Sequence, residues 1–196
     1  MQPQPDHLSA TYLGTDISDQ LPTRGGAAPP ARLQAARLVS LSRHIAEQPH
    51  DALQALVELA MKATSAHAAG LSLSQSHHGD EVFRWVATTG DLADQLGATM
   101  PRWFSPCGDV LRKNAVTLMQ LPIKHYPYIS QLDMPIQEVL LAPFAVDGEP
   151  QGTVWAVSRD ASKSFNLHDA RTLTELAAFV SDSTVLLERL RFGTTY

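Results

Sequence analysis

The sequence predicts an α+β fold, in which helical patterns begin and end the folded part and strand patterns lie between them. Three observations support this prediction. Apolar residues recur at helical spacing over residues 31–48 and again over 53–65, where Pro49 separates the two helices. Strand-like segments rich in β-branched, leucine and aromatic residues follow in pairs. A long helical pattern then runs over residues 166–190. Segregated helices and strands are typical of the α+β class.

Composition and charge exclude several classes of protein. The chain has 196 residues, of which 44% are apolar and 18% charged, which suits one packed domain with a tail. A formal net charge of −5 leaves no basic excess for nucleic acid or an anionic membrane surface. No apolar run approaches the roughly 18–20 residues of a membrane span, and the first residues lack the order of a signal peptide. We therefore expect a cytoplasmic protein.

The chain divides into three parts. Residues 1–30 are rich in proline and glycine and show no apolar period, which predicts a flexible N-terminal arm. Residues 31–192 hold all the periodic segments and form the predicted domain, and residues 193–196 are a short tail.

The strand segments form two pairs. Residues 68–75 and 82–88 are separated by a turn that contains Gly79, and residues 138–146 and 152–158 by the turn that contains Gly148. Between the pairs, residues 90–133 show only short mixed signals, including a helix start at Ser105 and a brief strand at 116–119. Irregular segments on a rigid frame often form the walls of binding sites.

The last helix has a clear beginning and an unusual apolar stripe. Asn166 and Asp169 have the spacing of an approximate capping box. A continuous helix from there to about residue 190 would be roughly 35 Å long. Its apolar positions alternate three and four apart, which favours pairing with another helix, although its first half also suits packing on a sheet. The predicted homodimer interface consists of Leu176, Val180, Leu187 and Leu190.

Three segments together resemble GAF domains of the type found in bacterial sensor histidine kinases. They are residues 105–111 (SPCGDVL), 135–144 (PIQEVLLAPF), and 152–157 (GTVWAV) with 165–169 (FNLHD) beyond. The resemblance implies a layered, PAS-like antiparallel sheet of about six strands, with the terminal helices on one face and a ligand pocket on the other. It also implies a sensory module in signal transduction that dimerises through its terminal helices. A histidine kinase or response regulator of a two-component system would be its partner.

The candidate ligand site gathers around the irregular middle of the chain. Ser105 and Pro106 are typical of a helix start, which is either a plain capped turn or one whose free amides at Cys107, Gly108 and Asp109 receive an anionic or carbonyl group. Aromatic side chains nearby would stack on a planar ligand, although core packing explains them equally simply. The candidate ligand-binding residues are Trp85, Trp103, Phe104, Ser105, Cys107, Gly108, His125, Tyr126, Tyr128 and Glu138. Glu138 is included because it is the acid within an apolar strand and must face solvent, a cation or the pocket.

The sequence argues against most cofactors and against catalysis. Cys107 is the single cysteine, so neither an internal disulfide nor a structural zinc site is expected. Bilin-binding relatives usually carry a Cys-His pair, which this sequence lacks, so a bilin is not expected. Haem is not expected either. Residues 162–166 do not reproduce the cyclic-nucleotide signature of the family. His77, His78 and Asp80 lie in a turn whose side chains point apart, so no metal is expected. No catalytic motif is found, and we assign no catalytic residue.

Three hypotheses remain open at this stage. In the first, a small molecule enters the pocket and biases the terminal helices. In the second, side chains fill the pocket and the domain only dimerises or docks to a separate kinase or regulator. In the third, Cys107 at a helix start is a reactive thiol for redox sensing or catalysis. The identity of the ligand does not follow from the sequence.

Overall fold

One antiparallel sheet of six strands organises the computed structural model, which describes residues 16–26, 31–132 and 134–192. Its strands are β1 Ala68–His77, β2 Asp80–Gly90, β3 Thr99–Pro101, β4 Thr117–Gln120, β5 Glu138–Val146 and β6 Glu149–Ser158. Their order is β3-β2-β1-β6-β5-β4, and each neighbouring pair is antiparallel. The predicted six-stranded antiparallel sheet is confirmed, although the short β3 has no counterpart in the sequence prediction.

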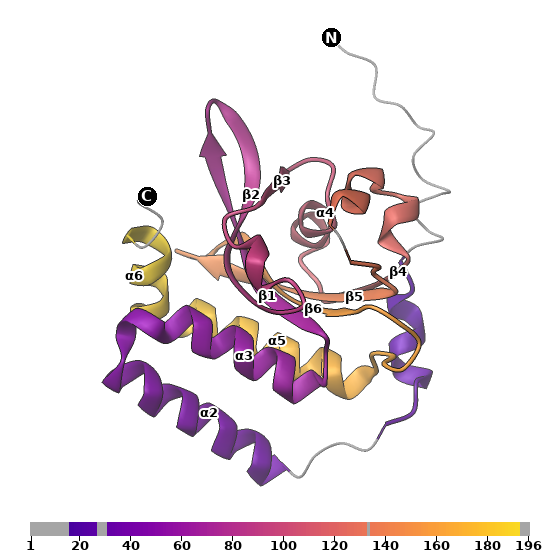
Figure 1. Cartoon of the computed structure of the whole chain (residues 1–196). Coiled ribbons are helices and arrows are strands. Elements are labelled where there is room, and N and C mark those ends of the chain that lie inside the picture. The colour runs from indigo at the N-terminus through magenta and orange to yellow at the C-terminus, as the bar shows by residue number, and fades with distance from the viewer. Residues whose placement is uncertain (1–15, 27–30, 133, 193–196) are drawn as a thin grey trace.

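Helices cover both faces of this sheet, as Figure 1 shows. The α-helices are α2 Ala31–Glu47, α3 Ala52–Thr64, α4 Pro106–Lys113, α5 Leu167–Asp182 and α6 Thr184–Phe192. The short 3-10 helices are η2 Ser18–Thr23, η3 Pro49–Asp51, η4 Ala93–Gln95, η5 Pro122–Lys124 and η6 Pro127–Gln131. α3 and α5 lie against one face with α2 outside α3, and α4 lies over the other face (Figure 1). The predicted layered α+β fold is confirmed. Among the described helices, none is both long and apolar enough to cross a membrane.

Glycine makes the two long hairpins possible. β1 and β2 are joined by His78 and Gly79, and β5 and β6 by Asp147 and Gly148. All four residues have positive φ, with 91° at Gly79 and 84° at Gly148. A two-residue turn of this kind matches the twist of antiparallel strands, and glycine adopts the second position without strain.

Strand alternation divides the interior into two cores. On β6, Val154 and Ala156 pack with the helices, whereas Trp155 and Val157 belong to the core under α4. The same alternation on β5 places Leu140 in the helical core. Successive side chains of a strand point to opposite faces of the sheet. The sheet therefore separates the two cores, and residues of the two cores are neighbours along each strand.

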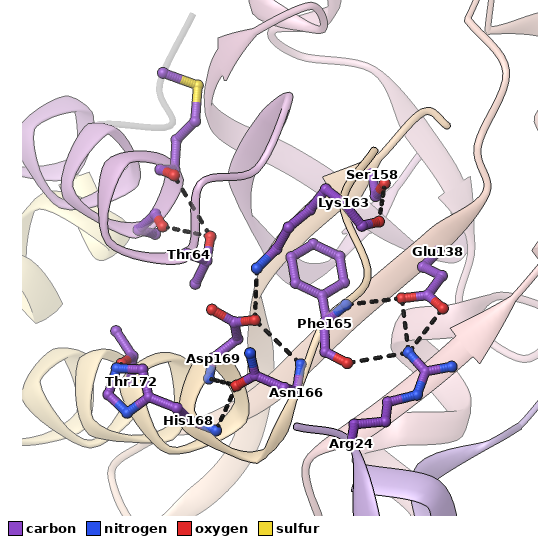
Figure 2. Close-up of polar contacts among 12 residues, drawn as sticks. Arg24, Thr64, Glu138, Ser158, Lys163, Phe165, Asn166, His168, Asp169 and Thr172 are labelled. Carbon is purple, nitrogen blue, oxygen red and sulfur yellow. Dashed lines mark hydrogen bonds and ion pairs between the residues drawn. The ribbon is translucent and has the colours of Figure 1, made fainter. Parts of the chain in front are cut away.

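The predicted cap of α5 is confirmed in detail. The Asn166 side-chain oxygen accepts hydrogen bonds from the amides of His168 and Asp169 at 2.8 and 3.1 Å. The Asp169 carboxylate accepts from the Asn166 amide at 3.1 Å and from Lys163 Nζ at 2.6 Å. Figure 2 shows this reciprocal arrangement, which satisfies amides that a helix start otherwise leaves without partners.

The predicted single helix over residues 166–190 is wrong, because it breaks at Ser183. Ser183 has extended backbone angles (φ −91°, ψ 107°), and its hydroxyl accepts from the Leu186 amide at 3.4 Å to begin α6. α6 then packs against α3.

The break changes the interpretation of the predicted dimer stripe. Leu176, Val180 and Leu190 are 2%, 0% and 1% exposed and lie in the core of their own chain, and Leu187 is half-buried beside them. The first three therefore do not form a surface for a partner helix in this structure. Their spacing reflects intramolecular packing, since α5 covers the sheet and α6 returns to the helical layer.

The segment formed by residues 16–26 differs from the flexible arm that the sequence predicts. Ile17 and Leu21 are 7% and 5% exposed and belong to the helical core. The Ile17 amide donates to the Leu118 carbonyl at 2.9 Å, and the Ser18 hydroxyl accepts from the Leu118 amide at 2.9 Å. This segment therefore occupies hydrogen-bonding groups on the free edge of β4. The remainder of the predicted arm lies outside the described residues.

Arg24 anchors the same segment by a buried ion pair with Glu138. Arg24 Nη1 lies 2.8 and 3.0 Å from the two carboxylate oxygens and 3.0 Å from the Phe165 carbonyl oxygen. The Phe165 amide also donates to Glu138 at 2.9 Å. Figure 2 shows these contacts from three distant parts of the sequence. Glu138 is 2% exposed, so it is a structural residue paired with Arg24 and does not belong to the ligand site that the sequence predicted.

We expect Arg24→Met to lower the free energy of unfolding by about 3 kcal/mol, because it leaves the buried Glu138 carboxylate without its cation. Urea denaturation measures the change. The control is Arg32→Met, on an exposed part of α2, with an expected effect within about 0.5 kcal/mol. Adding Glu138→Gln to Arg24→Met removes the unpaired charge and is expected to restore part of the loss. Equal stability of the wild type and Arg24→Met would contradict the structural role.

Candidate ligand-binding site

A small cavity lies between the sheet and the segments that contain α4, η5 and η6. Its volume is about 40 Å³. The lining residues are Trp85, Leu92, Met100, Pro106, Cys107, Pro122, Ile129, Leu132, Ile136, Val139, Leu141, Trp155 and Val157. None of these side chains carries a charge at neutral pH, so the cavity is an apolar space on the face where the sequence predicted a pocket.

Two tryptophans line the strand side of the cavity. The rings of Trp85 on β2 and Trp155 on β6 lie 4.8 Å apart, tilted by 49°. Trp155 crosses Gly70, where an added Cβ would lie 2.1 Å from the Trp155 ring, so only glycine leaves room for it. The Trp155 indole N–H donates to the Ser72 hydroxyl at 2.9 Å. The Trp85 indole N–H is also buried, but it has no acceptor among the described residues.

The start of α4 is satisfied within the chain. The Ser105 hydroxyl accepts from the Gly108 amide at 3.1 Å, and the Ser105 carbonyl accepts from the Asp109 amide at 3.1 Å. A Cβ on Gly108 would lie 2.0 Å from the Arg102 carbonyl oxygen, so this glycine permits a backbone contact. The expectation that the Gly108 amide receives a ligand is not supported, because Ser105 already occupies it.

Cys107 is a buried thiol in the cavity wall. It is 2% exposed, and its Sγ accepts a hydrogen bond from Thr153 Oγ1 at 3.2 Å. Burial raises the pKa of the Cys107 thiol, because the apolar surroundings disfavour the thiolate. A reactive thiol at this helix start would need a lowered pKa, so the raised pKa of Cys107 argues against that hypothesis.

A buried tyrosine ties the irregular segment to α4. Tyr126 is 1% exposed, and its hydroxyl donates to Asp109 Oδ2 in a short hydrogen bond. Asp109 is itself 3% exposed and forms an ion pair with Arg112 one helical turn later. A hydrogen bond to a charged acceptor is stronger than one between neutral groups. This contact therefore holds the η5–η6 side of the cavity in place.

The other predicted aromatic residues lie around the cavity and do not line it. Trp103 and Phe104 are 68% and 38% exposed. The Phe104 ring contacts His125 and Tyr126 at centroid distances of 5.6 and 5.3 Å. His125 is half-buried, and its burial lowers the pKa of the imidazole. Tyr128 is also half-buried, with a hydroxyl that has no partner among the residues described, and burial raises its pKa.

The structure thus brings only part of the predicted site together. Trp85 and Cys107 line the cavity, whereas Ser105, Gly108 and Tyr126 support its wall and Glu138 lies elsewhere. The sequence analysis missed the aliphatic lining, which comes mainly from β5, β6 and residues 122–136. Strand alternation was a signal that could have identified part of it, because Val139 and Leu141 share one face of β5.

Other surfaces are weaker candidates. A hollow of about 480 Å³ between α2 and α3 is larger, but it is lined by charged side chains such as Arg37, Glu58 and Lys62. Glu58 and Lys62 are 44% and 69% exposed there. No cluster of three metal-binding side chains occurs within residues 16–26, 31–132 and 134–192.

Replacing Tyr126 by phenylalanine is expected to lower the free energy of unfolding by about 1.5–3 kcal/mol, since a buried hydrogen bond to Asp109 is lost. Tyr128→Phe is the matched control. Its hydroxyl has no partner in the described chain, so its removal is expected to change stability by less than about 0.5 kcal/mol or to increase it. Chemical denaturation of both variants checks the difference, and equal losses would contradict the assigned role of Tyr126.

Cys107 is expected to react slowly with iodoacetamide at pH 7 in the folded protein. Its raised pKa keeps the thiol protonated, and burial blocks the reagent. The rate is measured by mass spectrometry against the same chain in denaturant, where labelling is expected to be at least about tenfold faster at the same pH. Labelling of the folded protein at the denatured rate would show an exposed, ionised thiol.

Comparisons with known proteins agree with this architecture. The GAF domain profile matches residues 48–183. The sequence has no match among curated proteins. Among solved structures, the chain is similar to the GAF domain of a phosphoenolpyruvate-protein phosphotransferase from Acinetobacter, with TM-score 0.66, 15% identity, and 84% of this chain and 98% of that chain covered. It is also similar to a free methionine-R-sulfoxide reductase from Neisseria meningitidis, solved with its substrate, with TM-score 0.60, 19% identity, and 86% and 94% covered.

A third similar structure is the second GAF domain of DevS from Mycobacterium smegmatis, with TM-score 0.58, 16% identity, and coverage of 74% of this chain and 99% of that chain. At these identities the structural likeness establishes the fold. The sequence profile covers more than two thirds of the chain and includes the sheet, α4 and α5. The chain therefore belongs to the GAF domain family.

Proposed function

We propose that this chain is a sensory GAF domain that binds a small molecule in the apolar cavity beneath α4, η5 and η6. The observation that carries the proposal is the cavity itself, an apolar space between the sheet and the irregular segment. A fully side-chain-filled interior would leave no such space. Pockets of this kind, mostly apolar with few polar groups, are typical of small-molecule sites.

In this proposal the small cavity is the closed state of the ligand site. About 40 Å³ accommodates one to three water molecules, whereas sites for drug-sized ligands are roughly 300 Å³ or more. Ligand entry therefore requires the η5–η6 wall to move away from the sheet. This wall consists of short 3-10 turns, whose polar attachments include Tyr126 to Asp109 and the Leu121 amide to the Gln137 carbonyl at 2.8 Å.

A ligand that stabilises an open wall would change the equilibrium between two arrangements, which is the physical requirement for a sensor. β5 offers a route for the change. Val139 and Leu141 face the cavity, whereas Leu140 between them packs with the helices. Glu138 is bonded to the Phe165 amide, directly before α5. A displacement of β5 would thus reach α5 and, beyond Ser183, α6.

We further propose that the output is a separate signalling protein, with a histidine kinase or response regulator in the cytoplasm as the leading candidate. Self-association remains part of the proposal. It would use surfaces other than Leu176, Val180 and Leu190, which are buried in their own chain.

A docking module without a ligand is the second candidate, and two observations favour it. The cavity is small, and Trp103 and Phe104 expose aromatic surface next to α4. Exposed aromatic residues are enriched at protein interfaces. In this alternative the cavity stays closed, and the domain acts only by binding another protein.

A redox or catalytic function has less support. The sequence contains one cysteine, and that thiol is buried with a raised pKa. The similar reductase from Neisseria meningitidis shares the fold at 19% identity, which is too low to transfer its activity. We therefore propose a regulatory domain and not an enzyme.

The proposal is tested by filling the cavity. Ile136→Phe adds about one methylene of volume at the lining, which is expected to displace a bound small molecule. Ile123→Phe is the matched control, because Ile123 is 41% exposed on η5 and does not line the cavity. Native mass spectrometry of the purified chain is expected to show a non-covalent adduct that Ile123→Phe retains and Ile136→Phe loses. An adduct that both variants retain equally would contradict this site.

If the chain carries no adduct, thermal-shift measurements against a library of small molecules provide the second readout. The sensor proposal expects stabilisation of the wild type and of Ile123→Phe by at least one compound, with a smaller effect in Ile136→Phe. The absence of both an adduct and any stabilisation would favour the docking module.

A further inference from the structure

We infer that a surface groove beside α4, here called the α4 groove, is a docking site for an acidic segment of a partner protein. Trp103 is its apolar anchor, and Arg102 and Arg112 are its charged contacts. The volume of the groove is about 180 Å³. The inference goes beyond the proposed ligand site and does not depend on it, because no residue lines both the groove and the cavity.

Three parts of the chain form the α4 groove. α4 contributes Gly108, Leu111 and Arg112, which are three and four residues apart and therefore share one face of the helix. Arg102 and Trp103 come from the segment directly before α4, and β2 and β6 each add one apolar residue. The groove is thus built on the sheet and on a helix, which fixes the positions of its charged and aromatic side chains.

The charge of the α4 groove is opposite to that of the chain. Its lining contains two arginines and no acidic residue, whereas the formal net charge of the chain is −5. Glu81 has a carboxylate oxygen 3.8 Å from Arg102 Nη1, but it lies outside the lining. Complementary charge across an interface steers association and disfavours partners of like charge. The groove therefore suits an acidic partner.

Both arginines retain capacity for a further contact. A guanidinium has five N–H donors in a planar fork, which matches the two oxygens of a carboxylate. Arg102 uses Nη1 for the Ser74 hydroxyl and the ion pair with Glu81, and its Nε and Nη2 have no hydrogen-bond partner among the described residues. Arg112 forms an ion pair with Asp109, and its side chain is still 52% exposed. A carboxylate on a partner can therefore reach both guanidinium groups.

Trp103 is an exposed side chain that the two arginines hold in place. Arg102 Cζ lies 5.4 Å from the centroid of its ring, and Arg112 Nη1 donates to its carbonyl oxygen at 3.5 Å. A single exposed apolar residue is common on protein surfaces. Tryptophan and arginine gathered at one groove, however, are the residue types that supply most of the binding energy at interfaces. Contacts made before a partner arrives also reduce the entropy lost on binding.

The size and exposure of the α4 groove favour a protein segment over a free small anion. About 180 Å³ is less than the roughly 300 Å³ of typical small-molecule sites. Because Trp103 is largely exposed, the groove is open to solvent, where salt screens a lone carboxylate and the ion pair contributes little. A protein segment gains additional contacts on either side of the groove. An acidic residue next to an apolar residue matches the arginines and Trp103.

A phage-displayed library of short random peptides tests the inference on the full chain. Peptides are selected in parallel on the wild type and on Trp103→Ala, and one that is enriched only on the wild type is synthesised with a fluorescent label. A neutral twin of this peptide carries Asn and Gln in place of Asp and Glu. Fluorescence anisotropy measures the affinities. Arg102→Gln tests the charged contact without removing the cation that pairs with the buried Asp109.

Two control variants match these changes. Val39→Ala removes an apolar side chain that is as exposed as Trp103 but lies on α2. Arg171→Gln removes an exposed arginine on α5. Thermal melting of every variant checks that it is folded.

Peptides enriched only on the wild type are expected to contain Asp or Glu next to an apolar residue. The neutral twin is expected to bind at least about tenfold more weakly, because it loses its charged contacts with both arginines. Arg102→Gln is expected to weaken binding of the acidic peptide about threefold to tenfold. Val39→Ala and Arg171→Gln are expected to stay within about twofold of the wild type. Added NaCl is expected to lower the affinity, since it screens the charges.

Each contrary result has a distinct meaning. Enrichment of the same peptides on both proteins, or of none, would overturn the docking site. A neutral twin that binds as tightly as the acidic peptide would overturn the acidic class. Displacement of the labelled peptide by an equal concentration of free N-acetylglutamate would show a small-anion site. A wild-type dimer that Trp103→Ala abolishes in sedimentation would assign the groove to a second copy of the chain. The ligand cavity is tested separately, by the adduct and thermal-shift measurements.

Discussion

The buried carboxylate of Glu138 is the constraint on which much of this structure depends. It begins β5, accepts from the amide that precedes α5, and requires a cation from outside the sheet. Arg24 supplies that cation from a segment more than a hundred residues away. Because a buried charge is stable only when it is paired and hydrogen-bonded, these three parts of the chain must assemble together. The N-terminal segment is thus a component of the folded domain and protects the β4 edge of the sheet.

The sheet gives the domain two interiors with different properties. The helical interior contains closely packed side chains of α3, α5 and α6, and the leucines that resemble a dimer stripe belong to it. The opposite interior contains larger aromatic and sulfur-bearing side chains, including Trp155 stacked over Gly70, and it retains a cavity. Irregular segments pack less regularly than helices, which accounts for the apolar cavity on that side.

Local patterns predicted most of the fold, whereas contacts between distant residues limited the prediction of the site. Helix periods, strand alternation and the Asn166 cap are properties of neighbouring residues, and apart from the break at Ser183 and the short β3 they were predicted correctly. The partner of Glu138 was not, because Arg24 lies in a segment whose composition indicates an arm. The apolar stripe of the last helix also misled, since packing on the chain's own core and pairing with another helix produce the same spacing.

The site shows the same limit. Aromatic and polar residues were favoured as candidates, but Trp103 is exposed and aliphatic residues of β5 and β6 line the cavity. Within the described parts of the chain the Trp85 indole N–H has no acceptor, whereas that of Trp155 is bonded to Ser72, and no local sequence pattern encodes this difference.

The interruption at Ser183 gives the end of the domain a mechanical property. Two complete helices meet at one extended residue, and the hydrogen bonds of each helix close without the other. Rotation about the two backbone dihedral angles of this residue would swing the axis of α6 while α5 stays intact on the sheet. Because Leu186 and Leu190 are buried and α6 packs against α3, the direction of α6 is set by the helical core and not by continuity with α5.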